Sequence, residues 1–331
     1  MPQGAWARRY RNPLLAWALT AVPLKYKQLR TLSVEAGSHP RGLPFLSAAS
    51  GLVRVRDRFY VVADDELHLG VFPVDSTAPL RLVRVLEGEL PRSPKKRKAQ
   101  KPDLECLLLL PASDEYPYGS LLALGSGSRA NRFTGASLGL DARGDAAGPA
   151  RQIPLEPLYA DLVGRFDKLN IEGAFVVGDS LMLLQRGTGL GLGASIRFDL
   201  AEVMEWVGGR RTVALRPRVV RTFDLGTVDG VPYAFTDGTA LPDGSWVFSA
   251  VAEDRGDSYD DGPCVGAAIG VCGSDDTLQS LEALTPTRKV EGIEAQVSGA
   301  TAVLSLVTDA DDPGQAAELG TTVVSVRPAG R

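Results

Sequence analysis

The stretch Gly135-Ala-Ser-Leu-Gly-Leu140 recurs almost unchanged as Gly193-Ala-Ser-Ile-Arg-Phe198 and as Gly266-Ala-Ala-Ile-Gly-Val271. Weaker copies occur at residues 66–71 and 321–326. Side chains in these copies alternate with a period of two, which is typical of a strand and not of a helix. Five copies of one strand indicate a chain built from repeats, and repeats of this kind are found in solenoids and propellers.

Two further signatures precede each copy. The first is an aliphatic residue, an acid and a small residue, as in Leu104-Glu105-Cys106, Ile171-Glu172-Gly173 and Val290-Glu291-Gly292. Phe235-Thr-Asp237-Gly238 resembles it with aspartate as the acid, and Ser50-Gly51-Leu52 is a fainter copy without an acid. An apolar run that ends in polar residues follows each of these anchors, usually after turn residues. Anchor and run together therefore predict a β-hairpin.

A fourth strand-like stretch completes four of the units, at residues 80–85, 151–155, 218–223 and 277–281. The last unit lacks it, but residues 29–36 contain a strand of the missing type. A β-propeller closes its ring when a terminal strand completes the last blade, because this removes an open sheet edge. We predict an all-β fold, a β-propeller of five four-stranded blades, closed by this strand. A sheet hidden in a long loop would make six blades, whereas a two-sheet sandwich does not predict the borrowed strand.

The composition is that of an ordinary folded domain and excludes several function classes. The chain has 331 residues, 44% of them hydrophobic, and a net charge of −4, which gives no general reason to bind nucleic acid or an anionic membrane. Three cysteines cannot build a disulfide framework, and two histidines disfavour a multi-histidine zinc site. We predict a single propeller domain over residues 29–331 and expect a monomer without a nucleic-acid partner; a protein partner is left open.

Residues 1–28 differ from the repeats and form an N-terminal extension. Arg8, Arg9 and Arg11 precede the apolar stretch 13–24, which resembles a weak export signal but is too short to span a bilayer. No other segment has enough continuous apolar residues, so no integral membrane span is expected. We expect a cytoplasmic protein with this extension packed on the domain; a cleaved signal would instead make it periplasmic or secreted.

Some stretches fall outside the predicted blades. Residues 201–206 have a helix-forming composition, and residues 92–101 carry six cations. Such a basic run can bind polyanions or act as an import signal, but we expect a solvated loop leading into the second blade. The acidic loops 253–262 and 308–313 do not match the EF-hand order, and we expect them to be solvated as well.

The recurrent acids are the best functional clue. In a propeller the first strand of each blade lines the central channel, and the second strand returns to the same mouth. Four acids are therefore expected to converge there: Glu105, Glu172, Asp237 and Glu291. The polar residues that end the second strands should ring the same opening: Ser126, Ser128, Arg129, Gln185, Arg186, Glu253, Asp254, Thr308 and Asp309.

Carboxylates in one narrow ring raise one another's pKa values, and burial adds to the effect. A hard cation such as Ca²⁺ or Mg²⁺ would relieve this, with candidate ligands Glu105, Glu172, Asp237, Glu253, Glu291 and Asp309. Neutralisation by Lys101, Arg129, Arg186 and Lys289 is a second arrangement. A third is hydrogen bonding to backbone amides, which would make the acids structural pins between blades. The candidate ligand-binding residues are Ser126, Ser128, Arg129, Arg186, Lys289 and Thr308.

Several of these motifs resemble an uncharacterised bacterial propeller family, a domain of unknown function, over about residues 29–328. The matching stretches are Asn170-Ile-Glu-Gly173, Phe235-Thr-Asp237 and residues 121–129, 250–253, 289–293 and 307–311. More distantly, the repeated aliphatic-Glu-Gly step is similar to the phytase-like and esterase-like propellers. Phytase propellers use calcium ions and carboxylates in the channel to bind phosphate esters. That resemblance implies a metal-dependent hydrolase of phosphoesters or carboxylic esters. Glu172 or Glu291 would then be the general base, and Arg129 and Arg186 would hold the anionic group.

Three functions therefore stay open from the sequence. The one we favour is a propeller that binds a metal ion or a small polar or anionic ligand at an acidic channel mouth. The second is the hydrolase, with Glu172 and Glu291 as catalytic residues and Ca²⁺ or Mg²⁺ as its cofactor. The third is a protein-interaction scaffold whose channel is purely structural.

Overall fold

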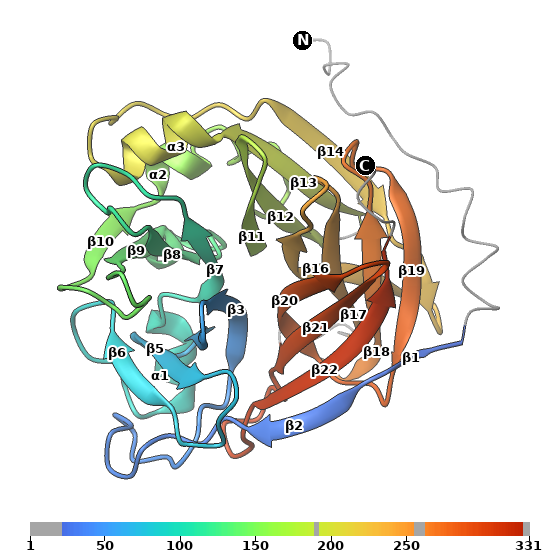
Figure 1. The fold of residues 1–331 in the computed structure, drawn as a ribbon, viewed down its shortest axis with the longest axis horizontal. Helices are drawn as coiled ribbons and strands as arrows, with labels where there is room; N and C mark the ends of the chain where they lie inside the picture. The colour runs from blue at the N-terminus through green and yellow to red at the C-terminus, as the bar shows by residue number, and fades with distance from the viewer. Residues whose placement is uncertain (1–21, 189–191, 255–261, 327–331) are drawn as a thin grey trace.

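The computed structural model describes residues 22–188, 192–254 and 262–326, so most of the expected export signal and of the acidic loop 253–262 lies outside the described residues. Within these ranges no helix is long and apolar enough to cross a bilayer. Five small sheets form a ring, and the first strands of neighbouring sheets contact one another around its centre (Figure 1). This arrangement confirms the five-bladed β-propeller predicted from the repeats.

Blades 1 to 3 each consist of four consecutive antiparallel strands. Blade 1 contains β3 (Ala49–Val55), β4 (Arg58–Ala63), β5 (His68–Pro73) and β6 (Arg81–Arg84). Blade 2 contains β7 (Leu104–Leu110), β8 (Ser120–Gly125), β9 (Thr134–Gly139) and β10 (Arg151–Pro154). Blade 3 contains β11 (Ile171–Val177), β12 (Ser180–Thr188), β13 (Leu192–Asp199) and β14 (Val219–Asp224).

Blades 4 and 5 both receive a strand from the N-terminal region. Blade 4 contains β16 (Val231–Ala240), β17 (Trp246–Glu253), β18 (Cys264–Cys272) and β19 (Leu278–Thr285), flanked by β15 (Thr227–Val228) and by β1 (Leu24–Lys25). Blade 5 contains β20 (Val290–Ser298), β21 (Thr301–Thr308) and β22 (Glu318–Ser325), with β2 (Lys27–Thr31) as its outermost strand.

Strand β2 closes the ring as predicted. It pairs antiparallel with β22, with Lys27 opposite Thr321 and Thr31 opposite Glu318. The strand begins two residues before the predicted stretch 29–36 and ends at Thr31. It ends there because the chain turns away and pairs elsewhere: Ser33 bridges Phe45, and Val34 bridges Leu80.

The apolar core lies between the blades. Five separate clusters of buried apolar side chains fill the five interfaces between neighbouring blades. The interface of blades 3 and 4 is the most aromatic, with Phe235 in contact with Phe223, Trp246 and Phe248. Because burial of apolar area stabilises each interface at about 25 cal/mol per Å², the centre of the ring is free to hold polar side chains.

The basic run is a helix, and the prediction of a solvated loop is wrong. Helix α1 (Pro94–Gln100) begins with proline, a residue favoured in the first helical turn. Its Arg97 is buried, donates to the backbone carbonyl of Asp65 at 2.8 Å and lies 2.9 Å from Glu66 Oε1. These contacts fix α1 against blade 1. Burial of Arg97 decides the structure here, and a charged run gives no sign of it.

The remaining helices are short. Helix α3 (Leu200–Val207) confirms the helix expected at 201–206, and the side chain of Asp199 caps it by accepting a hydrogen bond from the Glu202 backbone at 3.0 Å. Helix α2 (Glu156–Tyr159) and the 3₁₀ helix η2 (Ala130–Arg132) lie in loops of blades 2 and 3.

Candidate functional site

The first strand of every blade carries a β-bulge at the same place. The bulges fall at Ser50, Glu105, Glu172, Thr236 and Glu291. A bulge adds one unpaired residue and re-aims its side chain. Four of these residues, the three glutamates and Ser50, line one cavity at the mouth of the channel. The recurrent glutamate of the sequence is therefore the residue that a bulge turns toward the channel.

The small residue after the bulge is required by the neighbouring blade. A Cβ atom on Gly51 would lie 2.9 Å from the backbone nitrogen of Leu107, and one on Gly292 would lie 2.9 Å from that of Leu52. Both distances are too short for a side chain. The acid-small step thus combines a channel residue with a close contact between blades.

Asp237 does not occupy the position predicted for it. In the bulge of β16, Thr236 is the residue that has no pairing partner on β17. Thr236 is therefore the equivalent of the glutamates in the other blades. The alignment of the repeats, which placed Asp237 there, is wrong by one residue. A shift of one residue turns a side chain to the other face of a strand. Asp237 is 1% exposed, and its Oδ2 accepts a hydrogen bond from the backbone of Ile293 at 3.0 Å. It therefore pins blade 4 to blade 5, the third arrangement considered above.

The cavity has a volume of about 320 Å³, and charged and polar side chains line it. Seven of them are basic: Lys98, Lys101, Arg129, Arg132, Lys168, Arg186 and Lys289. Seven are acidic: Asp64, Asp103, Glu105, Glu172, Glu291, Asp309 and Asp311. The neutral ones are Ser50, Ser128 and Asn170. These residues belong to blades 1, 2, 3 and 5 and to α1, so only the closed ring brings them together.

Two buried cations connect the glutamates across the channel. Arg186 lies 3.3 Å from Glu172 and 2.5 Å from Glu253 of blade 4. Lys289 Nζ lies 2.9 Å from Glu253 and 3.3 Å from Glu291. Glu253 is thus shared between the two cations. These ion pairs are the second arrangement expected from the sequence, neutralisation by basic residues.

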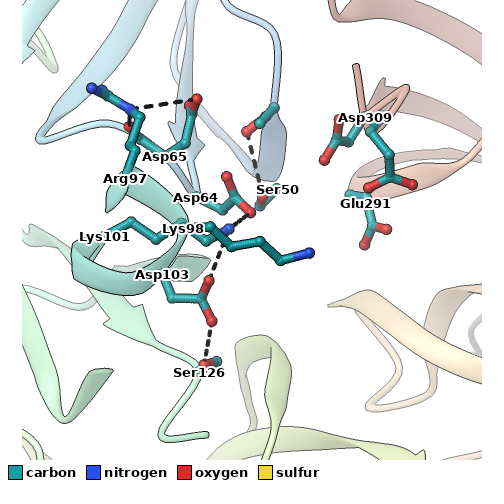
Figure 2. Close-up of polar contacts among 12 residues, drawn as sticks. Ser50, Asp64, Asp65, Arg97, Lys98, Lys101, Asp103, Ser126, Glu291 and Asp309 are labelled. Atoms are coloured by element: carbon teal, nitrogen blue, oxygen red, sulfur yellow. Dashed lines mark hydrogen bonds and ion pairs between the residues drawn. The ribbon is translucent and has the colours of Figure 1, made fainter. Parts of the chain in front are cut away.

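A second group of ion pairs lies on the side of blades 1 and 2 (Figure 2). Lys101 Nζ contacts Asp64 and lies 2.9 Å from Asp103. Arg132 also pairs with Asp103, at 2.6 Å, and Ser126 Oγ donates to the same carboxylate at 2.6 Å. Asp103 therefore pairs with two cations and a serine on this side of the cavity, although it lies outside the repeated signature.

Three carboxylates on the side of blades 1 and 2 could hold a metal ion. Asp64, Asp103 and Glu105 each offer one oxygen, and these oxygens lie within 4.8 Å of one another. Carboxylate oxygens suit Ca²⁺ and Mg²⁺. Of the predicted metal ligands, Glu105 is the one in this group. Since the ammonium of Lys101 already lies between Asp64 and Asp103 (Figure 2), a metal ion would compete with a cation supplied by the protein.

The sequence of the chain matches a known protein family. Residues 45–324 match the "Family of unknown function (DUF6929)". The chain belongs to this family. This confirms the resemblance to a domain of unknown function that covers the propeller.

No curated protein matches the DUF6929 chain. Solved structures with a similar shape include an exo-β-1,3-galactanase from Phanerochaete chrysosporium, with a TM-score of 0.48, 10% identity and coverage of 92% of this chain and 70% of that one. An endo-arabinase from Bacteroides thetaiotaomicron has a TM-score of 0.47 and 10% identity, and the match covers 90% of this chain and 98% of that one. A glycosyl hydrolase from Bacteroides ovatus has a TM-score of 0.46 and 12% identity, and the match covers 96% of this chain and 99% of that one. Likeness at this level carries no argument about function.

Burial shifts the pKa values of the acids in the DUF6929 cavity. Burial raises the pKa of Glu291 to about 8, opposed by Lys289 and Arg186. It raises the pKa of Asp309 to about 7 and, against the nearby Lys101, that of Asp64 to about 6. Acids that titrate near neutral pH cluster at functional sites.

The structure brings most of the predicted site residues together. Four of the predicted ligand-binding residues line the cavity: Ser128, Arg129, Arg186 and Lys289. Ser126 is fully buried and supports Asp103, and Glu253 supports the two buried cations. Thr308 lies elsewhere: its hydroxyl accepts a hydrogen bond from the Glu318 backbone at 3.1 Å, and it lines a neighbouring cavity of about 530 Å³.

Proposed function

We propose that this propeller binds a small polar ligand in the charged cavity at the mouth of its channel. The observation that carries the proposal is the lining, in which every residue is charged or polar. Burial of charged groups is expensive, and a buried ion pair is often replaced by apolar side chains with no loss of stability. If these side chains served only to join the blades, apolar residues would do so without the desolvation cost of buried charges.

The size of the cavity fits the same function. Pockets for small molecules have volumes of about 300–1,000 Å³, and this one has about 320 Å³. Glu105 lines it without an ion pair or a hydrogen bond among the described residues, and burial and nearby acids raise its pKa well above the usual range. The raised pKa favours the protonated carboxyl, which offers a ligand one hydrogen-bond donor and one acceptor.

The experiment is thermal unfolding of the full chain with a panel of polar probes: neutral sugars, sugar phosphates, amino acids and dicarboxylates. A ligand that binds only the native state raises its stability by about 2.7 kcal/mol at a hundredfold excess over Kd. We expect at least one class to raise Tm, and Glu105→Gln, which keeps the size of the side chain, to reduce that shift. Lys96→Gln, an exposed residue of α1, is the matched control and should keep the shift. The proposal fails if no probe raises Tm or if both variants respond alike.

A divalent cation is the second candidate ligand, favoured by the three carboxylates Asp64, Asp103 and Glu105. The phosphoester or carboxylic ester hydrolase implied by the distant resemblance depends on such a metal. The hydrolase function therefore requires metal binding, which the experiment on Lys101→Gln in the Discussion tests.

A further inference from the structure

The charges of the cavity are separated into two walls. Blades 2 and 3 with α1 supply six basic and three acidic residues: Lys98, Lys101, Arg129, Arg132, Lys168 and Arg186 against Asp103, Glu105 and Glu172. Blades 5 and 1 supply one basic and four acidic residues: Lys289 against Asp64, Glu291, Asp309 and Asp311. We call the first group the basic wall and the second the acidic wall.

Lys98 lies at the boundary between the two walls. Its side chain extends from α1 across the mouth, with the ammonium directed toward the side of Glu291 and Asp309 (Figure 2). If Lys98 is counted with the acidic wall, that wall still has four acids against two bases, and the basic wall has five bases against three acids. The separation of charge therefore does not depend on the position of this one side chain.

Glu291 and Asp309 are the least neutralised acids of the acidic wall. Glu291 is 4% exposed, and its Oε1 accepts no hydrogen bond within the described residues, although Lys289 lies 3.3 Å away. Lys289 is shared with Glu253 and with Asp311, which lies at 2.6 Å. Asp309 accepts a hydrogen bond from the backbone of Asp311 at 2.8 Å, and the described part of the chain gives it no ion pair at 4.0 Å or less. Both carboxyls would gain from a further cation.

We propose that the ligand of this cavity is a zwitterion. The basic wall would hold its anionic group, a carboxylate or a phosphate, and Glu291 and Asp309 would hold its protonated amine. The inference rests on the proposed function and deepens it by naming the chemical class of the ligand. Turning the ligand round would bring like charges together on both walls, so the walls also fix its orientation. Amino acids and phosphorylated amino sugars have this chemistry.

Proton release on binding follows from the same geometry. The pKa values of Glu291 and Asp309 lie at about 8 and about 7, so both carboxyls are partly protonated at pH 7. An ammonium placed beside them lowers these pKa values, and protons leave. Calorimetric titration in two buffers with different ionisation enthalpies measures the number of protons released. A ligand without an amine should release fewer.

The test titrates the full chain with two matched sets of probes. The first set is glucosamine 6-phosphate, glucose 6-phosphate and glucosamine, and the second is γ-aminobutyrate, butyrate and butylamine. We expect the zwitterion of at least one set to bind about tenfold or more tightly than both of its singly charged analogues, a difference of about 1.4 kcal/mol. The two sets distinguish phosphate from carboxylate as the anionic group.

Two variants assign the walls. Lys168 is an exposed residue of the basic wall, so Lys168→Gln should weaken binding of the zwitterion severalfold and leave the amine-only probe unchanged. Glu291→Gln should weaken the preference over the anion-only probe and reduce the proton release to the share of Asp309. Lys96→Gln and Glu205→Gln, both at exposed helix positions, are the controls. If Glu291→Gln does not fold, the probe sets on the unmodified chain still decide.

The outcomes separate this inference from the proposed function. If neither set shows a zwitterion that binds more tightly than its singly charged analogues, the inference is overturned and the proposed function still stands. The same follows if neutral sugars or simple anions bind and neither zwitterion does. If no probe of any charge binds, both are overturned.

Discussion

Lys101 occupies the place that a divalent cation would need. Its ammonium contacts Asp64 and lies 2.9 Å from Asp103, within the only group of three acids in the described residues whose oxygens meet the spacing of a metal site. We predict that Lys101→Gln binds Ca²⁺ or Mg²⁺ more tightly than the unmodified chain, because the competing charge is gone. Thermal unfolding after chelation, with and without each ion, measures this. Lys96→Gln is again the control.

The metal experiment has two contrary outcomes. Equal shifts of Tm in Lys101→Gln and in the unmodified chain would show that the ion does not compete with Lys101 and binds outside this group of carboxylates. If neither ion shifts Tm in either protein, divalent-cation binding is excluded, and the metal-dependent hydrolase is excluded with it.

Glu291 gives stability a defined dependence on pH. Burial raises its pKa from 4.5 to about 8, so the folded state holds a proton that the unfolded state has lost between these values. Stability contributed in this way is full below pH 4.5 and falls as pH rises to 8, by up to about 1.4 kcal/mol per pH unit for each carboxyl. Asp309, whose pKa is about 7, adds a fall of the same sign.

The measurement is urea denaturation between pH 6.5 and 8.5. This range avoids His39, whose pKa burial lowers to about 4 and whose effect has the opposite sign below pH 6.5. The free energy of unfolding should fall with pH in the unmodified chain and fall less steeply in Glu291→Gln, which cannot ionise. Identical slopes in the two proteins would contradict the burial of a protonated Glu291.

Asp237 has a structural role that a variant can distinguish from the binding role of the cavity acids. Because its carboxylate accepts the hydrogen bond of the Ile293 backbone inside the protein, Asp237→Ala should lower the free energy of unfolding by about 1–3 kcal/mol. It should leave ligand binding unchanged at temperatures where the chain is folded. Glu105→Gln should show the reverse pattern. Loss of binding without loss of stability in Asp237→Ala would restore Asp237 to the cavity.

At the scale of elements, closure of the ring by the N-terminal chain is the feature most open to test. Tyr26, between β1 and β2, is 7% exposed, and its ring fills the space over Gly320 of β22. Tyr26→Ala should lower the free energy of unfolding by about 3 kcal/mol or more. Leu29→Ala changes an exposed position of β2 and should have little effect. Equal, small effects in denaturant melts would mean that the strand is not needed to hold blade 5.

The sequence predicted the strands well and two local features poorly. Strands could be found because their alternation and their order repeat in every blade. Helix α1 could not, because its position depends on the burial of Arg97 against Asp65 and Glu66. The bulge at Thr236 could not be placed either, since Phe235-Thr-Asp237-Gly238 offers an acid one residue too late and no local pattern shows which residue is left unpaired.

At the scale of the whole molecule, the propeller puts its apolar core between blades and its charges at the centre. The convergence of Glu105, Glu172 and Glu291 was predictable, because their places in the repeat fix their places in the ring. Asp103 was missed because it precedes its strand and lies outside the repeated signature, whereas Asp64 was missed although it directly follows the second strand of its blade, as Asp309 does. Lys98 and Lys168 were missed because nothing in the repeat marks the helix and the loop that carry them. The walls of opposite charge therefore become visible only in the closed ring.

The most direct test of the ligand site is a crystal structure of the full chain with the polar probe that raises Tm most. The account predicts density for that probe within the cavity bounded by Glu105, Lys168 and Glu291. Density for the probe on an outer blade face, or a cavity without the probe in crystals of a complex that forms in solution, would contradict it.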